Sequence, residues 1–296
     1  MTKIGIVGIG DMGSGIAKNL IAVGFDVHGI DTLEKRMQDF VSLGGIGAKS
    51  LADLATDAAA VFVMVMTGAQ AKSVIFGEDG LAVHLPKGSS IILTATIKPA
   101  EAAEIATGLE DSGIHLIDSP VSGGFPGAQG GTLTMMAAGN DVAMENCRHF
   151  MEAVSGTIHK VGDAAPAGQI VKACLQSLIG SIFSATFEAA TLAAKAGVPG
   201  EILYNVFSTS GASSGITNNA LQKIIDRQFE GTGSHIATMH KDLTISLALA
   251  EELGVPLHTA STAMQLFHAG KTKYPDGDNW VVTRVLEEIV GAELHR

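Results

Sequence analysis

Lys172 is the residue of this sequence whose surroundings point most directly to chemistry. It lies in a stretch rich in Ala, Leu and Ile, residues 167–197, whose apolar pattern predicts one long helix. A buried lysine on such a helix can exchange a proton with a reacting hydroxyl and stabilise the charge that develops on the oxygen. Gln176 follows one helical turn later on the same face, where its amide can orient a bound group. A lysine that reaches solvent at the helix edge fits the same periodicity, so both interpretations stand at this level.

A glycine-rich loop lies near the start of the sequence, in the order Gly8-Ile9-Gly10-Asp11-Met12-Gly13. It follows a strand pattern and opens a helical one, as in loops that place a pyrophosphate against a helix N-terminus. Asp31 ends the next predicted strand, where a carboxylate would hydrogen-bond both ribose hydroxyls and repel a 2′-phosphate. This arrangement predicts NAD as the cofactor, although Lys35 and Arg36 are residues that would suit NADP.

A second glycine-rich loop, Ser122-Gly123-Gly124, follows a predicted strand that ends at Asp118. Ligands of α/β sheets bind at the carboxyl ends of the strands, so this loop is placed to hold a substrate. Ser-Gly-Gly is also common in flexible loops without a ligand. Asp118 is expected to anchor the loop through hydrogen bonds.

The elements that must position these residues divide the sequence into two parts. In the first part, short β-branched runs alternate with helical stretches, which predicts a doubly wound, mostly parallel sheet. Two more strands are expected at 130–139 and 157–161 around a helix at 141–154, and after residue 163 only helical patterns remain. We therefore predict an α/β protein with a Rossmann domain (1–163), a long connecting helix, and an all-α domain (164–296) for substrate binding and oligomerisation.

Composition narrows the possible partners. The chain has 296 residues, a net charge of −11 and 5% aromatic residues, which argues against nucleic-acid and membrane partners. No continuous apolar run approaches the roughly 20 residues of a membrane span, and no signal peptide is recognisable, so a soluble cytoplasmic protein is expected. Ten histidines without a close ligand pair predict no catalytic metal. Cys147 and Cys174 are expected to be buried thiols.

These motifs together resemble the β-hydroxyacid dehydrogenase family (3-hydroxyisobutyrate dehydrogenase-like), and the resemblance covers nearly the whole chain. Four separate signatures carry it: Gly8–Leu20; Asp118–Gly124 with Gly127-Ala128 and Gly131-Thr132-Leu133; Gly168–Gln176; and Lys241-Asp242-Leu243. The family combines a Rossmann domain, a long helix and an all-α domain.

The resemblance implies oxidation of a small hydroxy acid, with NAD as cofactor and Lys172 as the catalytic residue that exchanges a proton with the substrate hydroxyl. It also implies that Ser122, Gly123 and Gly124 hold the substrate carboxylate. Thr96 and Lys241 match family positions that contact the cofactor.

Gln176 departs from the asparagine usual in the family, and a glutamine here is similar to the L-threonate dehydrogenase-like branch. The segments 76–80 and 256–263 also resemble that branch, whereas Leu175 stands where the branch usually has histidine. An L-threonate-like sugar acid is therefore favoured as substrate. The enzymatic alternatives are oxidation of 3-hydroxyisobutyrate and reduction of tartronate semialdehyde or succinic semialdehyde. The non-enzymatic alternative is an NAD(H)-binding sensor. The apolar C-terminal helices predict a homo-oligomer, a dimer or tetramer.

Overall fold

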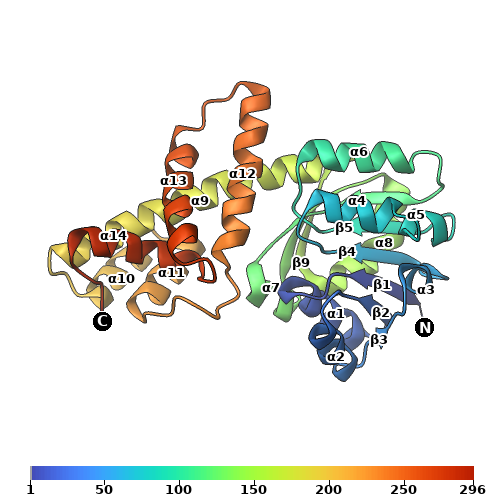
Figure 1. Cartoon of the computed structure of the whole chain (residues 1–296), viewed down its shortest axis with the longest axis horizontal. Helices are drawn as coiled ribbons and strands as arrows, with labels where there is room; N and C mark the ends of the chain where they lie inside the picture. Colours follow the sequence, from blue (N-terminus) through green and yellow to red (C-terminus); the bar gives the residue numbers. More distant parts are fainter. Residues whose placement is uncertain (1) are drawn as a thin grey trace. The chain divides into compact units, whose positions relative to one another are not determined.

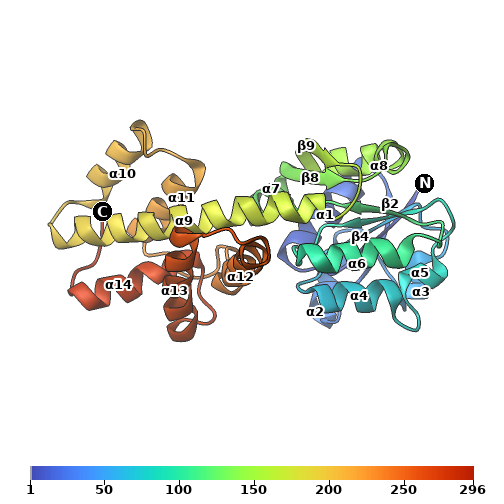
Figure 2. The ribbon, with the colours of Figure 1, turned by 90° about the horizontal axis from the view of Figure 1, so that it is seen from above.

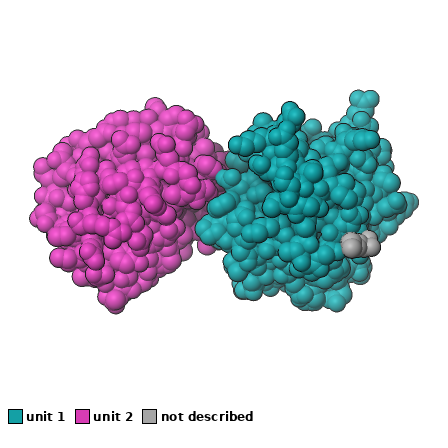
Figure 3. Space-filling view, turned by 90° about the horizontal axis from the view of Figure 1, so that it is seen from below, with its two compact units in different colours: residues 1–172 teal, residues 173–296 magenta. Residues whose placement is uncertain are grey.

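The computed structural model describes residues 2–296 and forms two compact units (Figure 3). Unit 1 comprises residues 1–172 and unit 2 comprises residues 173–296. The division falls inside the 29-residue helix α9 (Ala167–Lys195), which contributes its first turns to unit 1 and the rest to unit 2. The boundary predicted from the sequence, after Asp163, lies just past the last strand of unit 1.

A nine-stranded sheet forms the centre of unit 1. Its order is β3-β2-β1-β4-β5-β6-β8-β7, with β9 paired to β8. The strands are β1 (Lys3–Val7), β2 (Asp26–Ile30), β3 (Ile46–Gly47), β4 (Ala60–Val63), β5 (Ser90–Leu93), β6 (His115–Asp118), β7 (Val121–Ser122), β8 (Leu133–Ala138) and β9 (Ser155–Gly162). The strands β1 to β6 are parallel to one another, and β8 runs antiparallel to β6 and β7. The order 3-2-1-4-5-6 is that of a dinucleotide-binding sheet, which confirms the predicted Rossmann fold.

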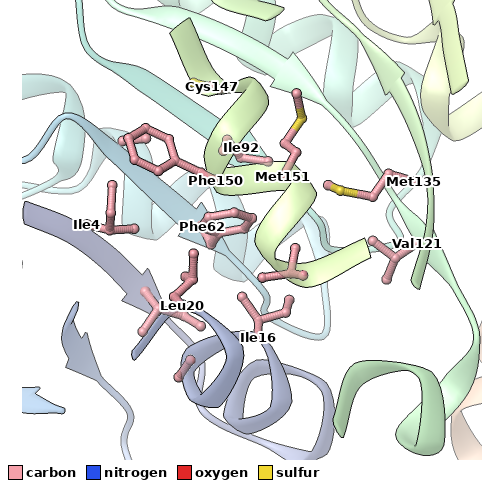
Figure 4. Close-up of a cluster of buried hydrophobic side chains, with 14 of the residues drawn as sticks. Ile4, Ile16, Leu20, Phe62, Ile92, Val121, Met135, Cys147, Phe150 and Met151 are labelled. Atoms are coloured by element: carbon pink, nitrogen blue, oxygen red, sulfur yellow. The ribbon is translucent and has the colours of Figure 1, made fainter. Parts of the chain in front are cut away.

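Helices cover both faces of this sheet, so the central strands are buried on both sides (Figure 1). On one face, α1 (Asp11–Val23) and α8 (Asp141–Val154) pack side chains such as Leu20 and Phe150 against Phe62 of β4 (Figure 4). On the other face, α3 (Leu51–Ala55), α4 (Gly68–Phe76), α5 (Leu81–His84) and α6 (Pro99–Leu109) pack against the alternate strand residues. The remaining helices of unit 1 are α2 (Glu34–Ser42) and α7 (Gly124–Gly130).

Unit 2 is entirely helical, as predicted. Besides α9 it contains α10 (Gly200–Thr209), α11 (Gly215–Ile225), α12 (Ile236–Leu253), α13 (His258–Lys273), a short 3-10 turn (Asn279–Val281) and α14 (Val282–Val290). Figure 2 shows α10 and α11 on one side of α9 and α13 and α14 on the other. Phe183 and Phe187 of α9 meet Phe267 and Trp280 in the core, where Trp280 is 2% exposed.

The apolar character of α9 follows from this packing. Among residues 2–296, it is the one helix whose length and composition match those of a membrane span, with a mean hydropathy of 1.4 over its most apolar window. Phe183, Phe187 and Ala190 of this helix lie in the core of unit 2, and 44% of the apolar window is buried. The prediction of two buried thiols is wrong for Cys174, which lies exposed on α9, whereas Cys147 is buried.

Candidate active site

The glycine loop lies between β1 and α1, and its three glycines meet different demands. Gly8 has φ +89°, and a Cβ atom on it would lie 2.3 Å from the Met64 carbonyl oxygen. A Cβ atom on Gly13 would lie 1.9 Å from the Gly8 carbonyl oxygen, so the loop and the first turn of α1 meet at backbone contact there. A Cβ atom on Gly10 would meet nothing closer than the Arg36 side chain at 3.6 Å. The middle glycine therefore leaves its backbone open, as close approach of a pyrophosphate requires.

Asp31 is fixed against this loop by its own carboxylate, which is 5% exposed. Its Oδ2 accepts a hydrogen bond from the Ile9 N–H at 2.7 Å, and its Oδ1 accepts one from the Leu33 N–H at 2.9 Å. Arg36 forms an ion pair with the same carboxylate at 3.4 Å and also faces Gly10. The structure thus brings Asp31, Arg36 and the loop together, with Asp11 and Met12 as the first two residues of α1.

The Ser122-Gly123-Gly124 loop is bound to the helix that follows the glycine loop. Gly123 and Gly124 have φ values of +131° and +58°, a left-handed region that favours glycine. The helix α7 that begins here packs on α1, where the Asn19 amide donates to the carbonyl oxygens of Gly15 and Ala128 at 2.7 and 2.8 Å. Because α1 also starts at the glycine loop, both candidate binding loops are attached to the same helix.

Lys172 is buried beside the serine loop, with only 6% of the residue exposed. Its Nζ donates a hydrogen bond to the carbonyl oxygen of Val121 at 2.8 Å, the residue immediately before Ser122. This burial excludes the alternative in which the lysine reaches solvent at the helix edge. The amine instead lies next to the loop predicted to hold the substrate.

The first turn of α9 is anchored to the end of β6. A Cβ atom on Gly168 would lie 2.5 Å from the Asp118 carbonyl oxygen, so only glycine permits this approach. The Asp118 carboxylate is fully buried and accepts hydrogen bonds from the Gln169 backbone N–H at 3.1 Å and from Gln169 Nε2 at 2.7 Å. Burial raises the pKa of Asp118 to about 6, against the opposing effect of the hydrogen bonds from Gln169 and Gly168.

Thr96 lies between β5 and α6, and Gln169 contacts the backbone on both sides of it. The Gln169 Nε2 donates to the Ala95 carbonyl oxygen, and its Oε1 accepts from the Ile97 N–H, both at 3.0 Å. Sequence reasoning did not single out Gln169, whose only signal was its place inside the Gly168–Gln176 signature.

In unit 2, Gln176 and Lys241 are brought together by Asp242. The Gln176 Nε2 donates to Asp242 Oδ2 at 2.5 Å, and the Lys241 Nζ lies 2.9 Å from Asp242 Oδ1. Both Gln176 and Asp242 are buried. A hydrogen bond from Ser246 of α12 to the Ala173 carbonyl oxygen of α9, at 2.8 Å, holds the two helices close. Asp242 was not predicted as a site residue, although it stands in the Lys-Asp-Leu motif.

The residues of unit 1 suit a nucleotide cofactor and an acidic, hydroxyl-bearing substrate. Unit 1 supplies an open glycine backbone, a fixed carboxylate at the end of β2, a glycine-rich loop and a buried amine. Within residues 2–296, no group of three or more His, Cys, Asp and Glu side chains lies where it could hold a metal ion.

Comparison with known proteins agrees with this description. Residues 3–162 match the family model described as the NAD binding domain of 6-phosphogluconate dehydrogenase. Residues 166–286 match the model described as NAD-binding of NADP-dependent 3-hydroxyisobutyrate dehydrogenase.

Individual relatives cover almost the whole chain. The L-threonate dehydrogenase of Escherichia coli K12 is 34% identical over 97% of this chain and 95% of its own length. An NAD-dependent L-serine dehydrogenase of Pseudomonas aeruginosa is 28% identical over 98% of this chain and 100% of its own. Among solved structures, a 3-hydroxyisobutyrate dehydrogenase from Salmonella typhimurium superposes with a TM-score of 0.89 and 31% identity, covering 96% of this chain and 100% of that one.

Proposed function

Because this chain belongs to the β-hydroxyacid dehydrogenase family (3-hydroxyisobutyrate dehydrogenase-like) and is an NAD-dependent oxidoreductase, we propose that it oxidises a four-carbon sugar acid of the L-threonate type. The observation that carries the chemistry is the buried Lys172 amine, 2.8 Å from the carbonyl oxygen that precedes Ser122. A proton-transfer group is thereby placed beside the loop proposed to hold the substrate.

The residues of unit 1 then have distinct roles. Bound NAD would supply the hydride acceptor for oxidation at the carbon that bears the substrate hydroxyl. Lys172, whose Nζ is buried beside the serine loop, takes the hydroxyl proton at that nitrogen. The Val121 carbonyl holds that nitrogen in place. Ser122 and the backbone N–H groups of Gly123 and Gly124 bind the carboxylate and orient the hydroxyl toward the lysine.

The cofactor is held by the glycine loop and by Asp31. The open face of Gly10 suits the pyrophosphate, and the Asp31 carboxylate suits the ribose hydroxyls. Thr96 and Lys241 are proposed as further cofactor contacts.

Gln176 supports a hydroxyl-rich substrate. Its amide nitrogen donates to Asp242, so the amide oxygen is the group we assign to the substrate. An oxygen acceptor binds a second hydroxyl of a sugar acid, whereas it gains nothing from the methyl group of 3-hydroxyisobutyrate. The L-threonate dehydrogenases among the relatives, at 34% identity, support the same substrate class.

The proposal is tested by following NADH absorbance with NAD or NADP and a panel of hydroxy acids. The panel contains L-threonate, D-erythronate, D-glycerate, L-serine and 3-hydroxyisobutyrate. Turnover of a four-carbon sugar acid with the highest kcat/KM is expected. Turnover of 3-hydroxyisobutyrate in its place would overturn the substrate while leaving the role of Lys172 intact. Tight NADH binding with no turnover of any acid would instead favour a sensor.

We propose a cytoplasmic homo-oligomer assembled through unit 2. Large apolar side chains are exposed on α9, α10 and α14, including Leu192 (72%), Ile202 (56%) and Ile289 (77%). Burying them against a second copy would remove this apolar area from water. A monomer mass in light scattering at micromolar concentration would contradict this assembly.

A further inference from the structure

We propose that Gln169 is a positioning residue whose side-chain amide joins the segment around Thr96 and the first turn of the Lys172 helix to one buried acid, Asp118. The inference rests on the roles proposed above for Thr96 and Lys172. It adds a group that touches neither substrate nor cofactor but determines where both contacting residues lie.

The oxygen and both N–H groups of the Gln169 side-chain amide have hydrogen-bond partners. Its Oε1 accepts from the Ile97 N–H and its Nε2 donates to the Ala95 carbonyl oxygen, each at 3.0 Å. These two backbone groups flank Thr96, so the amide pairs with that segment as a neighbouring strand would. The second Nε2 proton goes to Asp118 Oδ1 at 2.7 Å. With Gln169 only 1% exposed, water does not compete for these bonds.

The same residue anchors the helix of Lys172. The Gln169 backbone N–H donates to Asp118 Oδ2 at 3.1 Å, three residues before Lys172. Lys172 itself bonds to the Val121 carbonyl oxygen, three residues after Asp118. The first turn of α9 is thus attached at two points to one short segment, and a shift at Gln169 would displace the Lys172 amine.

The polarity of the amide is required. Glutamate at this position would present oxygen atoms to the Asp118 carboxylate and the Ala95 carbonyl, which are both acceptors. Leucine would fill a similar volume but leave the Ile97 N–H and the Ala95 carbonyl without partners in a buried place. If Gln169 only filled space, Gln169→Leu would be tolerated, and it would be tolerated better than Gln169→Glu, which places a second carboxylate beside Asp118.

The test uses Gln169→Glu, Asp118→Asn and the double variant in the full-length protein. In the double variant the new asparagine amide can donate to the introduced carboxylate, so the bond to position 118 is restored with reversed direction. Gln222→Glu, on the exposed face of α11, is the matched control and is expected to behave as wild type. Readouts are NADH binding by cofactor fluorescence, and kcat and KM for the best acid of the panel.

We expect Gln169→Glu to lower kcat/KM by about 100-fold and to weaken NADH binding about tenfold, because the buried Asp118 carboxylate loses its amide donor and faces a second carboxylate. The double variant should recover about tenfold of each loss relative to Gln169→Glu. Single and double variants with equal defects would overturn the proposal, as would a Gln169→Glu enzyme within about twofold of wild type.

A second measurement keeps the proposal testable if the glutamate variant does not fold. Gln169→Leu should raise amide hydrogen exchange in residues 94–98 and 167–172 while leaving α11 and α13 of unit 2 unchanged. Unchanged protection in residues 94–98 would overturn the proposal. NADH binding and hydrogen exchange need no substrate, so these results stand even if the sugar-acid assignment fails.

Discussion

The stability of unit 1 should carry a pH-dependent contribution from Asp118 that disappears in Asp118→Asn. Burial raises the pKa of this carboxyl from its ordinary 3.8 to about 6. The folded protein therefore holds the proton more tightly than the unfolded chain. The stabilisation is complete below the unfolded pKa of 3.8 and is lost as the pH rises through 6.

The magnitude follows from the difference between the two pKa values. A shift from 3.8 to about 6 corresponds to about 3 kcal/mol in the free energy of unfolding, and about 2 kcal/mol of it lies between about pH 4.5 and 7.5. Asparagine does not titrate in this range, so its profile lacks the contribution. The wild-type protein should gain about 2 kcal/mol relative to the variant as the pH falls across that interval.

The assay is urea unfolding followed by far-ultraviolet circular dichroism at constant ionic strength. The difference between wild type and variant is compared at each pH, because other titrating groups contribute equally to both proteins. At any single pH, the difference in the free energy of unfolding includes both the lost charge and a changed hydrogen bond to Gln169. Only the change of this difference with pH therefore reports on the pKa of Asp118. A difference constant to within about 0.5 kcal/mol over the interval would refute a raised pKa for Asp118.

Three further changes test separate contacts. Gly168→Ala places a Cβ atom 2.5 Å from the Asp118 carbonyl oxygen and should cost about 1–3 kcal/mol of stability in thermal unfolding, a cost that an unchanged midpoint would exclude. Ser122→Ala should raise KM about tenfold with a smaller fall in kcat, since one hydrogen bond to the carboxylate is removed; a fall confined to kcat would contradict the binding role. Asp31→Ala should shift the preference from NAD toward NADP about tenfold or more, because Arg36 loses its carboxylate partner at 3.4 Å. An unchanged ratio of the dissociation constants for NAD and NADP would argue against Asp31 as the residue that selects the cofactor.

The long helices and the buried β-branched strands were predictable from the sequence, and the shortest elements were not. The apolar pattern of residues 167–197 predicted α9, because a helix of that length repeats its buried face many times. β3 and β7 have two residues each, and α7 has seven, with Gly at both ends. Such elements contain too few residues to show a repeating apolar pattern. They form because the surrounding sheet and α1 supply their partners.

The candidate site divides in the same way. Gly8, Gly13 and Asp31 were predictable because a strand, a turn and a helix impose their spacing. The contacts of Gln169 with residues 95, 97 and 118 join segments more than 50 positions apart, and no local sequence pattern predicts such contacts. The predicted strand at 130–139 begins only at Leu133, since α7 takes up the residues before Gly131.

The placement of Trp280 in the core of unit 2 has a spectroscopic consequence. The chain has one tryptophan and two tyrosines, and Tyr204 and Tyr274 also lie in unit 2. Unit 1 therefore contributes no tryptophan or tyrosine emission, and the emission of NADH, which we propose that unit 1 binds, would report on that unit instead. Denaturation followed at both wavelengths would record the loss of each unit separately in a single unlabelled sample.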